Sequence, residues 1–281
     1  MVLAMMLLAS MDATAKYLVR DYTIVQILWV RFVIFLAVAL ALARRRGIAR
    51  TFVSRQWRLQ IVRSLVLLAE AAAFILSFSL LPLADVHAVA AAAPLLATAL
   101  AVPMLGERVG RHRWTAVAVG LLGVLVIVRP GMGTMQWAAA APLAAAFLWA
   151  LYQVLVRKVG LTDSVATTTL YTAAVGLAVL TLLVPFVWRA PDPGAWSLML
   201  LVGVLGSAGH IVLFKALELA PASALQPFGY MLMVWAAVMG YLVFDHIPDA
   251  PTMGGAVIVV LGGLYALHRE RLRAGASPSS R

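Results

Sequence analysis

Ten long apolar stretches limit what this chain can fold into. Crossing a bilayer core about 30 Å thick takes about 20 helical residues, and short polar or glycine- and proline-rich segments separate the stretches that approach this length. They cover residues 2–19, 24–43, 59–80, 86–105, 114–128, 135–156, 165–188, 196–217, 222–244 and 253–268. The sequence therefore predicts an all-α integral membrane protein with ten transmembrane helices.

Composition supports a bilayer as the solvent. Hydrophobic residues make up 64% of the 281 residues and charged residues 12%, and the mean hydropathy is +0.98. A water-soluble fold of this size has too few polar side chains to cover so much apolar surface. The net charge of +11 does not indicate a nucleic-acid partner, because the arginines lie between or after apolar stretches, where they act as orientation signals.

The distribution of lysine and arginine predicts the orientation. With the amino terminus inside, the inner loops and tail hold fifteen of these residues and the outer loops four, Lys16, Arg20, Arg129 and Arg189. Positive loops stay on the cytoplasmic side, so we expect both termini in the cytoplasm and a bacterial-type cytoplasmic (inner) membrane. Residues 270–281 are expected to form a disordered cytoplasmic tail.

A weak internal repeat divides the chain into halves. An acidic residue follows the fourth and the ninth stretch (Glu107 and Asp245), and a glycine stands inside each following stretch (Gly123 and Gly262), at offsets of 138 and 139 residues. Five crossings are an odd number, so the second copy must be inverted, as in many secondary transporters. We expect five-helix repeats over residues 1–131 and 132–269, although apolar composition alone also produces weak similarity.

One segment resembles a known family. The run 94–131 contains a mid-helix proline, then Leu-Gly-Glu, then a helix with spaced glycines, and it resembles the EamA-type domain of the drug/metabolite transporter superfamily. Arg31 is similar to the arginine which that family places in its second helix. The second copy departs from the pattern, with Asp245 in place of glutamate and Met231 or Leu232 in place of proline. The resemblance implies a ten-helix carrier. Members of the family are often exporters of amino acids or related metabolites, and the YddG-like amino-acid exporters are an example. Other members resemble importers of S-adenosylmethionine or riboflavin.

Ionisable residues inside the predicted spans are candidate site residues, because a charge at a helix centre costs about 2.5–3.5 kcal/mol or more. Asp12 and Arg31 lie at similar depth, so they form a structural ion pair, or Asp12 contacts the substrate. Glu70 binds a substrate amine, takes up a proton, or stays protonated against a neighbouring helix. His210 is a packing residue or a titratable site residue. His87 lies near a helix end, and we expect it to reach the interface.

Aromatic and amide side chains in mid-membrane are candidates for the wall of a substrate cavity. Trp149, Tyr152 and Gln153 share one face of the sixth stretch, and Tyr230 and Trp235 lie along the ninth. Tyrosine and tryptophan combine an apolar body with one hydrogen-bonding group, which suits loose binding of organic solutes. Ordinary helix packing is the alternative interpretation.

Two prolines and several glycines predict how the helices move and pack. Pro94 and Pro227 interrupt corresponding helices of the two halves, which predicts hinges. Glycines at 120, 123, 255 and 262 give the fifth and tenth helices close-packing faces. We expect a monomer or a weak homodimer.

The sequence lacks the zinc-protease, nucleophile-elbow and Walker motifs, and it contains no cysteine. We therefore expect no catalytic activity, metal or cofactor. The predicted function is secondary transport of small polar metabolites, amino acids foremost, in the export direction by alternating access, with protons as a candidate coupling ion. The alternatives are an importer of a larger metabolite such as S-adenosylmethionine or riboflavin, and an intramembrane lipid-modifying enzyme.

Overall fold

The computed structural model of the chain describes residues 1–44, 47–106, 110–129, 135–160, 162–219 and 228–276, and every regular element in these residues is a helix. The helices are α1 (Val2–Leu18), α2 (Ile24–Arg44), α3 (Ile48–Thr51), α4 (Trp57–Leu80), α5 (Leu83–Ala90), α6 (Ala93–Leu105), α7 (Arg111–Val128), α8 (Met135–Ala138), α9 (Ala140–Val159), α10 (Val165–Leu183), the 3-10 turn η1 (Val184–Phe186), α11 (Pro193–Leu219), α13 (Met231–Phe244) and α14 (Ala250–Ala276).

The prediction of an all-α membrane protein is confirmed. Within the described residues, six spans are long and apolar enough to cross a bilayer: Ile24–Ala41, Trp57–Leu80, Leu83–Leu105, Ala140–Val159, Val165–Phe186 and Pro193–Leu213. Three shorter apolar helices follow the same pattern, Trp114–Val128, Met231–Phe244 and Ala250–Tyr265. Together with α1, they correspond to the ten predicted stretches, although the first part of the ninth, residues 222–227, lies outside the described residues.

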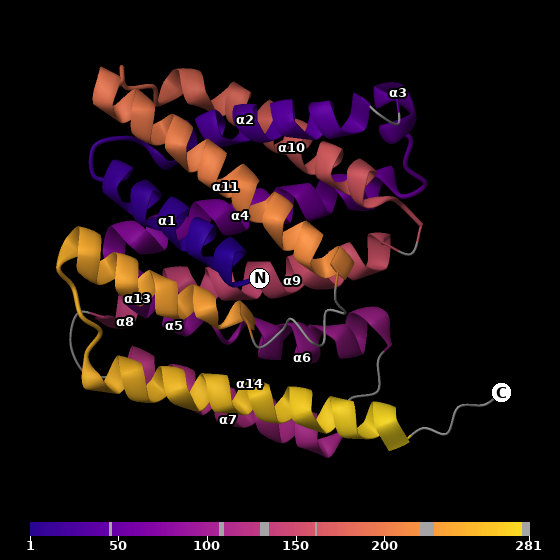
Figure 1. Cartoon of the computed structure of the whole chain (residues 1–281), viewed down its shortest axis with the longest axis vertical. Coiled ribbons are helices and arrows are strands. Elements are labelled where there is room, and N and C mark those ends of the chain that lie inside the picture. The colour runs from indigo at the N-terminus through magenta and orange to yellow at the C-terminus, as the bar shows by residue number, and fades with distance from the viewer. Residues whose placement is uncertain (45–46, 107–109, 130–134, 161, 220–227, 277–281) are drawn as a thin grey trace.

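The helices pack in matched pairs between the two halves (Figure 1). α7 lies against α14 at one edge of the bundle, and α2 lies against α10 at the opposite edge. Between these edges, α1 of the first half packs on α11 and α13 of the second half. In the corresponding way, α9 of the second half packs on α4 and α6 of the first half. Each contact thus recurs with the roles of the halves exchanged, which is the packing that an inverted five-helix repeat produces.

Glycines hold α7 and α14 together. A Cβ added to Gly123 would lie 2.8 Å from the carbonyl oxygen of Gly255, and one added to Gly262 would lie 3.3 Å from that of Ala116. The two backbones approach this closely only because these side chains are absent. The close-packing faces predicted on the fifth and tenth crossings are therefore used inside one chain.

Equivalent helices of the two halves end in the same backbone conformation. Gly106 after α6 has φ 68°, and Asp245 after α13 has φ 51°. Both residues are left-handed helix caps, a position that glycine favours and aspartate tolerates. Asp245 therefore occupies the place of Gly106, an offset of 139 residues that also relates Gly123 to Gly262. Glu107, with which the sequence paired Asp245, lies outside the described residues.

The fourth crossing is broken. α5 ends at Ala90 and α6 begins at Ala93, with Pro94 in the first turn of α6. Proline lacks the backbone N–H that would continue the helical ladder, and the first turn of a helix needs none. Pro94 thus restarts a helix after an interruption. Its predicted counterpart, Pro227, lies outside the described residues.

Candidate functional site

Three charged side chains gather in the interior of the bundle. Glu70, near the midpoint of α4, is only 8% exposed. It interacts electrostatically with Arg31 of α2 and Asp12 of α1, and Arg31 interacts with both acids. We call Asp12, Arg31 and Glu70 the central cluster. Glu70 is buried, and Asp12 and Arg31 are half-buried. A group of ionisable side chains inside membrane spans marks a functional site or a balanced structural network.

The glycines of α11 make room for this cluster. A Cβ on Gly206 would lie 2.7 Å from the sulfur of Met11 and 3.5 Å from Nε of Arg31. One turn further along, His210 Nδ1 lies 2.7 Å from the Gly206 carbonyl oxygen, and its ring centroid is 6.2 Å from that of Phe35. His210 also interacts electrostatically with the cluster, so it lies beside the candidate site.

Asp12 has a partner that the sequence did not predict. His87 Nε2 of α5 lies 3.2 Å from Asp12 Oδ2, whereas Arg31 interacts with Asp12 as a charge in the same cluster. The expectation that His87 reaches the interface is wrong, because its side chain is only 4% exposed. The rings of Phe74 and Phe78 on α4 lie 5.8 Å from the imidazole and cover it.

The predicted aromatic face of α9 lies close to the cluster. The rings of Trp149 and Tyr152 stack with centroids 5.4 Å apart and an interplanar angle of 26°. Tyr152 interacts electrostatically with Glu70, because α9 packs along α4. Gln153, the next residue, is half-buried. The structure thus brings Trp149 and Tyr152 to the same part of the bundle as the central cluster.

Sequence reasoning missed an arginine that is fully buried in the bundle. Arg63 of α4 is fully buried, and its guanidinium donates to Gln60 Oε1 (3.2 Å), the Tyr152 hydroxyl (3.2 Å), the Thr168 carbonyl oxygen (2.7 Å) and Thr172 Oγ1 (2.6 Å). It also lies over the Tyr152 ring, 5.4 Å from the centroid. The signal was present, since Arg63 lies inside the predicted span 59–80.

The same network continues to one end of the bundle. The Asp163 carboxylate, between α9 and α10, accepts hydrogen bonds from Ser54, from Gln60 Nε2 (2.9 Å) and from the Arg55 backbone N–H (3.3 Å). Burial opposes ionisation, but these hydrogen bonds outweigh it and lower the pKa of Asp163. We call this end the Asp163 end. The following seven residues, which join α4 of the first half to α9 and α10 of the second, are the Asp163 latch: Ser54, Gln60, Arg63, Tyr152, Asp163, Thr168 and Thr172.

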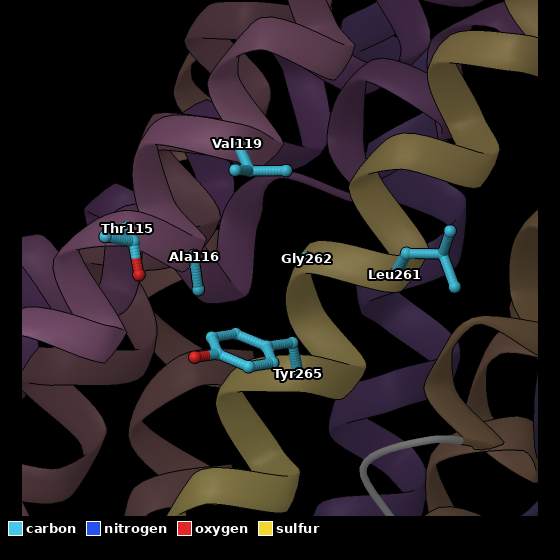
Figure 2. A pocket seen from close by; sticks show the side chains of 6 residues that line it. All are labelled: Thr115, Ala116, Val119, Leu261, Gly262 and Tyr265. Atoms are coloured by element: carbon cyan, nitrogen blue, oxygen red, sulfur yellow. The ribbon is translucent and has the colours of Figure 1, made fainter.

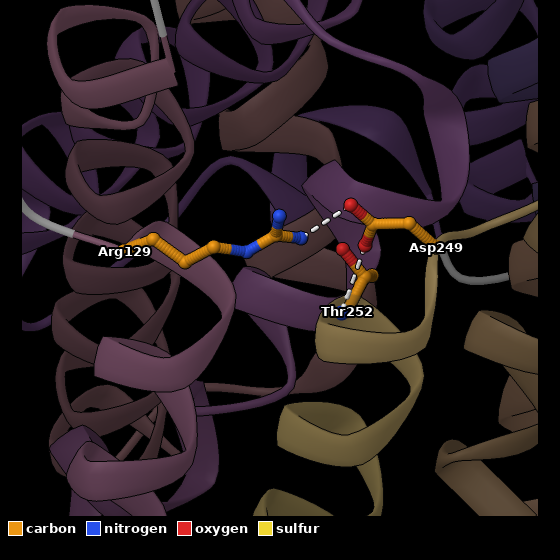
Figure 3. Close-up of polar contacts among 3 residues, drawn as sticks. All are labelled: Arg129, Asp249 and Thr252. Atoms are coloured by element: carbon orange, nitrogen blue, oxygen red, sulfur yellow. Dashed lines mark hydrogen bonds and ion pairs between the residues drawn. The ribbon is translucent and has the colours of Figure 1, made fainter. Parts of the chain in front are cut away.

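A smaller set of contacts lies at the other end, which we call the Asp249 end (Figure 3). Arg129, after α7, donates to the Asp249 carboxylate, whose other oxygen caps α14 by accepting from the Thr252 backbone N–H at 3.0 Å. The Arg129 guanidinium and the Thr252 hydrogen bonds lower the pKa of Asp249 to about 2. At the same end, Lys16 Nζ donates to the carbonyl oxygens of Phe78 and Leu81, both at 2.6 Å.

Two surface cavities are lined by residues outside the central cluster. A groove of ≈ 190 Å³ between α7 and α14 is lined by Thr115, Ala116, Val119, Leu261, Gly262 and Tyr265 (Figure 2). A second cavity of ≈ 310 Å³ at the Asp249 end is lined by residues 19–24, Ser79 and Arg189.

The two predicted aromatics near the ninth crossing occupy different surroundings. The Tyr230 hydroxyl lies over Gly263 of α14, where an added Cβ would be 1.7 Å away. Trp235 Nε1 is buried and has no hydrogen-bond partner among the described residues.

Comparison with known proteins identifies the class. The sequence matches the EamA-like transporter family over residues 1–129 and 136–267. The chain therefore belongs to the EamA-like transporter family, in the drug/metabolite transporter superfamily.

Several curated relatives cover much of the chain. It is 27% identical to an S-adenosylmethionine uptake transporter of Rickettsia felis over 92% of this chain and 88% of that protein. It is 26% identical to the pseudopaline exporter CntI of Pseudomonas aeruginosa over 96% and 95%. A riboflavin transporter of Vibrio cholerae is 31% identical, but over 63% of this chain and 60% of that protein.

One solved structure, described only as the crystal structure of a protein, matches with a TM-score of 0.66 at 18% identity, covering 98% of this chain and 97% of the other. This match supports the fold. The family and the names of the relatives point to transport of small metabolites rather than to catalysis.

Proposed function

We propose that this chain is a secondary transporter of amino acids or amino-acid derivatives, which binds its substrate at the central cluster and works by alternating access. The position of the buried Glu70 beside the half-buried Asp12 and Arg31 carries this proposal. Two acids and one base in a membrane interior leave a net negative charge when both acids are ionised, and a substrate cation would neutralise it.

The chemistry of an α-amino acid fits these groups. Its ammonium would contact Asp12 or Glu70, and its carboxylate would contact Arg31, whose planar guanidinium suits bidentate binding. Trp149 and Tyr152 would supply an aromatic wall for the rest of the substrate, as cavities for organic solutes usually have. His210, Gln153 and the residues of the ninth crossing, Tyr230 and Trp235, remain candidates at the edge of this cavity.

Alternating access would use the contacts between the two halves. The Asp163 latch joins α4 to α9 and α10 by hydrogen bonds at the Asp163 end. Opening that end would require these hydrogen bonds to separate, and the break at residues 91–92 allows α5 to move independently of α6. We further propose that the Asp163 end faces the cytoplasm, because the positive loops of the sequence lie on that side.

Direction and substrate size have two candidates. Export of free amino acids is our first proposal, and the similarity to an exporter in Pseudomonas aeruginosa supports it. Uptake of a larger derivative such as S-adenosylmethionine is the second, supported by similarity to Rickettsia uptake transporters over 92% of the chain.

A binding screen tests the proposal. Thermal unfolding of the purified protein would be followed with the twenty amino acids, S-adenosylmethionine and riboflavin in turn. A ligand at 100 times its Kd stabilises the folded state by about 2.7 kcal/mol, so a true substrate raises the unfolding temperature. Glu70→Gln should abolish that rise, whereas Asp21→Asn, an exposed loop carboxylate, should retain it. No rise with any ligand, or an undiminished rise in Glu70→Gln, would contradict the proposal.

A further inference from the structure

We propose that Asp12 and His87 form a proton-binding site that couples proton movement to transport. The inference rests on the proposed transport function and adds a coupling ion and the residues that bind it. Its starting observation is a carboxylate and an imidazole 3.2 Å apart in the interior of the bundle, with His87 4% exposed and the Asp12 side chain 14% exposed.

Apolar side chains cover the imidazole of this pair. Phe74 and Phe78 lie against the imidazole, and they belong to an apolar cluster drawn from α1, α4, α5 and α13 that includes Ala13, Leu83 and Val86. Nε2 of His87 is close enough to Asp12 for an ion pair but is not aligned for a hydrogen bond to any described residue. Among the described residues, this nitrogen is therefore not engaged in a structural hydrogen bond.

Charged and titratable groups from several elements act on the central cluster, to which Asp12 belongs, or on Asp85, two residues before His87 on α5. Arg31 on α2, Glu70 on α4 and His210 on α11 interact with Asp12, and Tyr152 on α9 interacts with Glu70. Lys16 on α1, Arg129 after α7, His246 and Asp249 interact with Asp85. Lys16 is engaged by two carbonyl oxygens, and Arg129 by Asp249. Neither is therefore free to neutralise Asp12.

Charge balance shows why a proton and a substrate would compete. Asp12 and Glu70, when ionised, carry two negative charges, and Arg31 carries one positive charge. A protonated His87 supplies the missing positive charge, and so does the ammonium of a substrate. Holding both leaves an excess positive charge in a medium where an uncompensated charge is costly. Binding of the substrate cation would thus favour release of the proton from His87.

The position of His87 connects protonation to movement. It lies on α5, the short helix that ends at Ala90 before the break and Pro94, whereas Asp12 lies on α1, which packs against α11 and α13 of the second half. When His87 is protonated, its ion pair with Asp12 holds α5 to α1. Loss of the proton removes the imidazolium charge, weakens this attraction and releases α5.

The step itself is a reversible proton transfer. Water at the open end of the pathway supplies a proton, which adds to the lone pair of the ring nitrogen facing Asp12 and changes the ring charge from 0 to +1. In the other state the same N–H bond breaks, and the proton leaves to water at the opposite end. No oxidant, reductant or covalent intermediate takes part.

Transport in proteoliposomes tests the coupling. Labelled S-adenosylmethionine and a labelled amino-acid mixture would serve as probes. Accumulation of each probe would be measured with a pH gradient of either sign, and counterflow would be measured separately without a gradient. In the wild type, one sign of gradient should drive accumulation. His87→Gln should reduce accumulation to the level measured without the gradient but retain counterflow, whereas Asp21→Asn, the exposed loop carboxylate, should behave as the wild type.

Two results would overturn the proposal. Wild-type accumulation that ignores the gradient rules out coupling, and gradient-driven accumulation that persists in His87→Gln assigns the coupling elsewhere. Absence of counterflow in the wild type with every probe would instead count against the proposed transport function.

A measurement independent of flux covers the case in which His87→Gln does not fold. In wild-type protein with 15N-labelled histidine, the ring of His87 should change protonation state within the pH range over which the protein stays folded. The signal would be assigned by its absence in His87→Asn. A ring that keeps one protonation state over the whole range would overturn the proposal.

Discussion

Replacing Arg63 by lysine should open the Asp163 latch. Lysine keeps the positive charge, but its ammonium cannot reproduce the fork by which the guanidinium reaches Gln60, Tyr152, Thr168 and Thr172. Loss of two charge-assisted hydrogen bonds at about 1.5 kcal/mol each amounts to about 3 kcal/mol. Since 1.4 kcal/mol is a factor of ten, the equilibrium between closed and open latch should shift about a hundredfold.

Cysteine labelling measures this shift directly, because the chain has no cysteine of its own. Ser64, beside Arg63, is fully buried, and Ser64→Cys is a small change. In the Arg63→Lys background, a water-soluble maleimide should label this cysteine about a hundredfold faster, in line with the shifted equilibrium.

Two controls isolate the latch. Arg58→Lys lies on the same helix but is exposed, so it should leave the labelling rate unchanged. A cysteine at Ser79, exposed near the other end of α4, should react equally fast with and without Arg63→Lys. If Ser64→Cys reacts at the same rate in both backgrounds, Arg63 does not hold the bundle closed.

Three further predictions concern other parts of the molecule. Gly123→Ala should lower the stability of the folded protein by about 1–3 kcal/mol through overpacking against Gly255, measured by thermal unfolding, whereas Gly254→Ala, where a Cβ meets nothing within 4 Å, should not. The folded pKa of Asp249, about 2, lies below its unfolded value of about 3.9. The unfolding-temperature difference between wild type and Asp249→Asn should therefore be full above about pH 4 and vanish as the pH falls through 2; a constant difference would refute the Arg129 contact. Tyr152→Phe should keep the stacking but weaken the latch, so transport kinetics should change while expression stays normal, and unchanged kinetics would rule out a role for the hydroxyl.

The membrane fold was predictable because its causes are local in sequence. The length and hydropathy of each stretch determine whether it spans a bilayer. Glycines at 123 and 262 predict a close-packed face on each of their helices, although they do not say which helix packs there. The sequence pairs Asp245 with Glu107 as acids, and this pairing stays a prediction. The structure adds a feature that the sequence did not indicate, the left-handed cap that Asp245 shares with Gly106.

The central site was predictable only in part. Asp12, Arg31 and Glu70 were found because each charge lies deep in its own span. His87 was misplaced, because its distance from a helix end says nothing about Phe74 and Phe78, which cover it from another helix. Arg63 was not singled out, because it lies close to the arginine-rich segment that precedes its span. Its partners on α9 and α10 are distant in sequence, so the sequence does not show that they meet.

Counterflow across a membrane tests the central claim most directly. Proteoliposomes loaded with unlabelled substrate from the binding screen would be diluted into a trace of the labelled compound, with Glu70→Gln and Asp21→Asn in parallel. We predict saturable uptake that depends on the internal substrate, is lost in Glu70→Gln and is retained in Asp21→Asn. Uptake no faster than in empty liposomes, or equal uptake by Glu70→Gln and the wild type, would contradict transport through the central cluster.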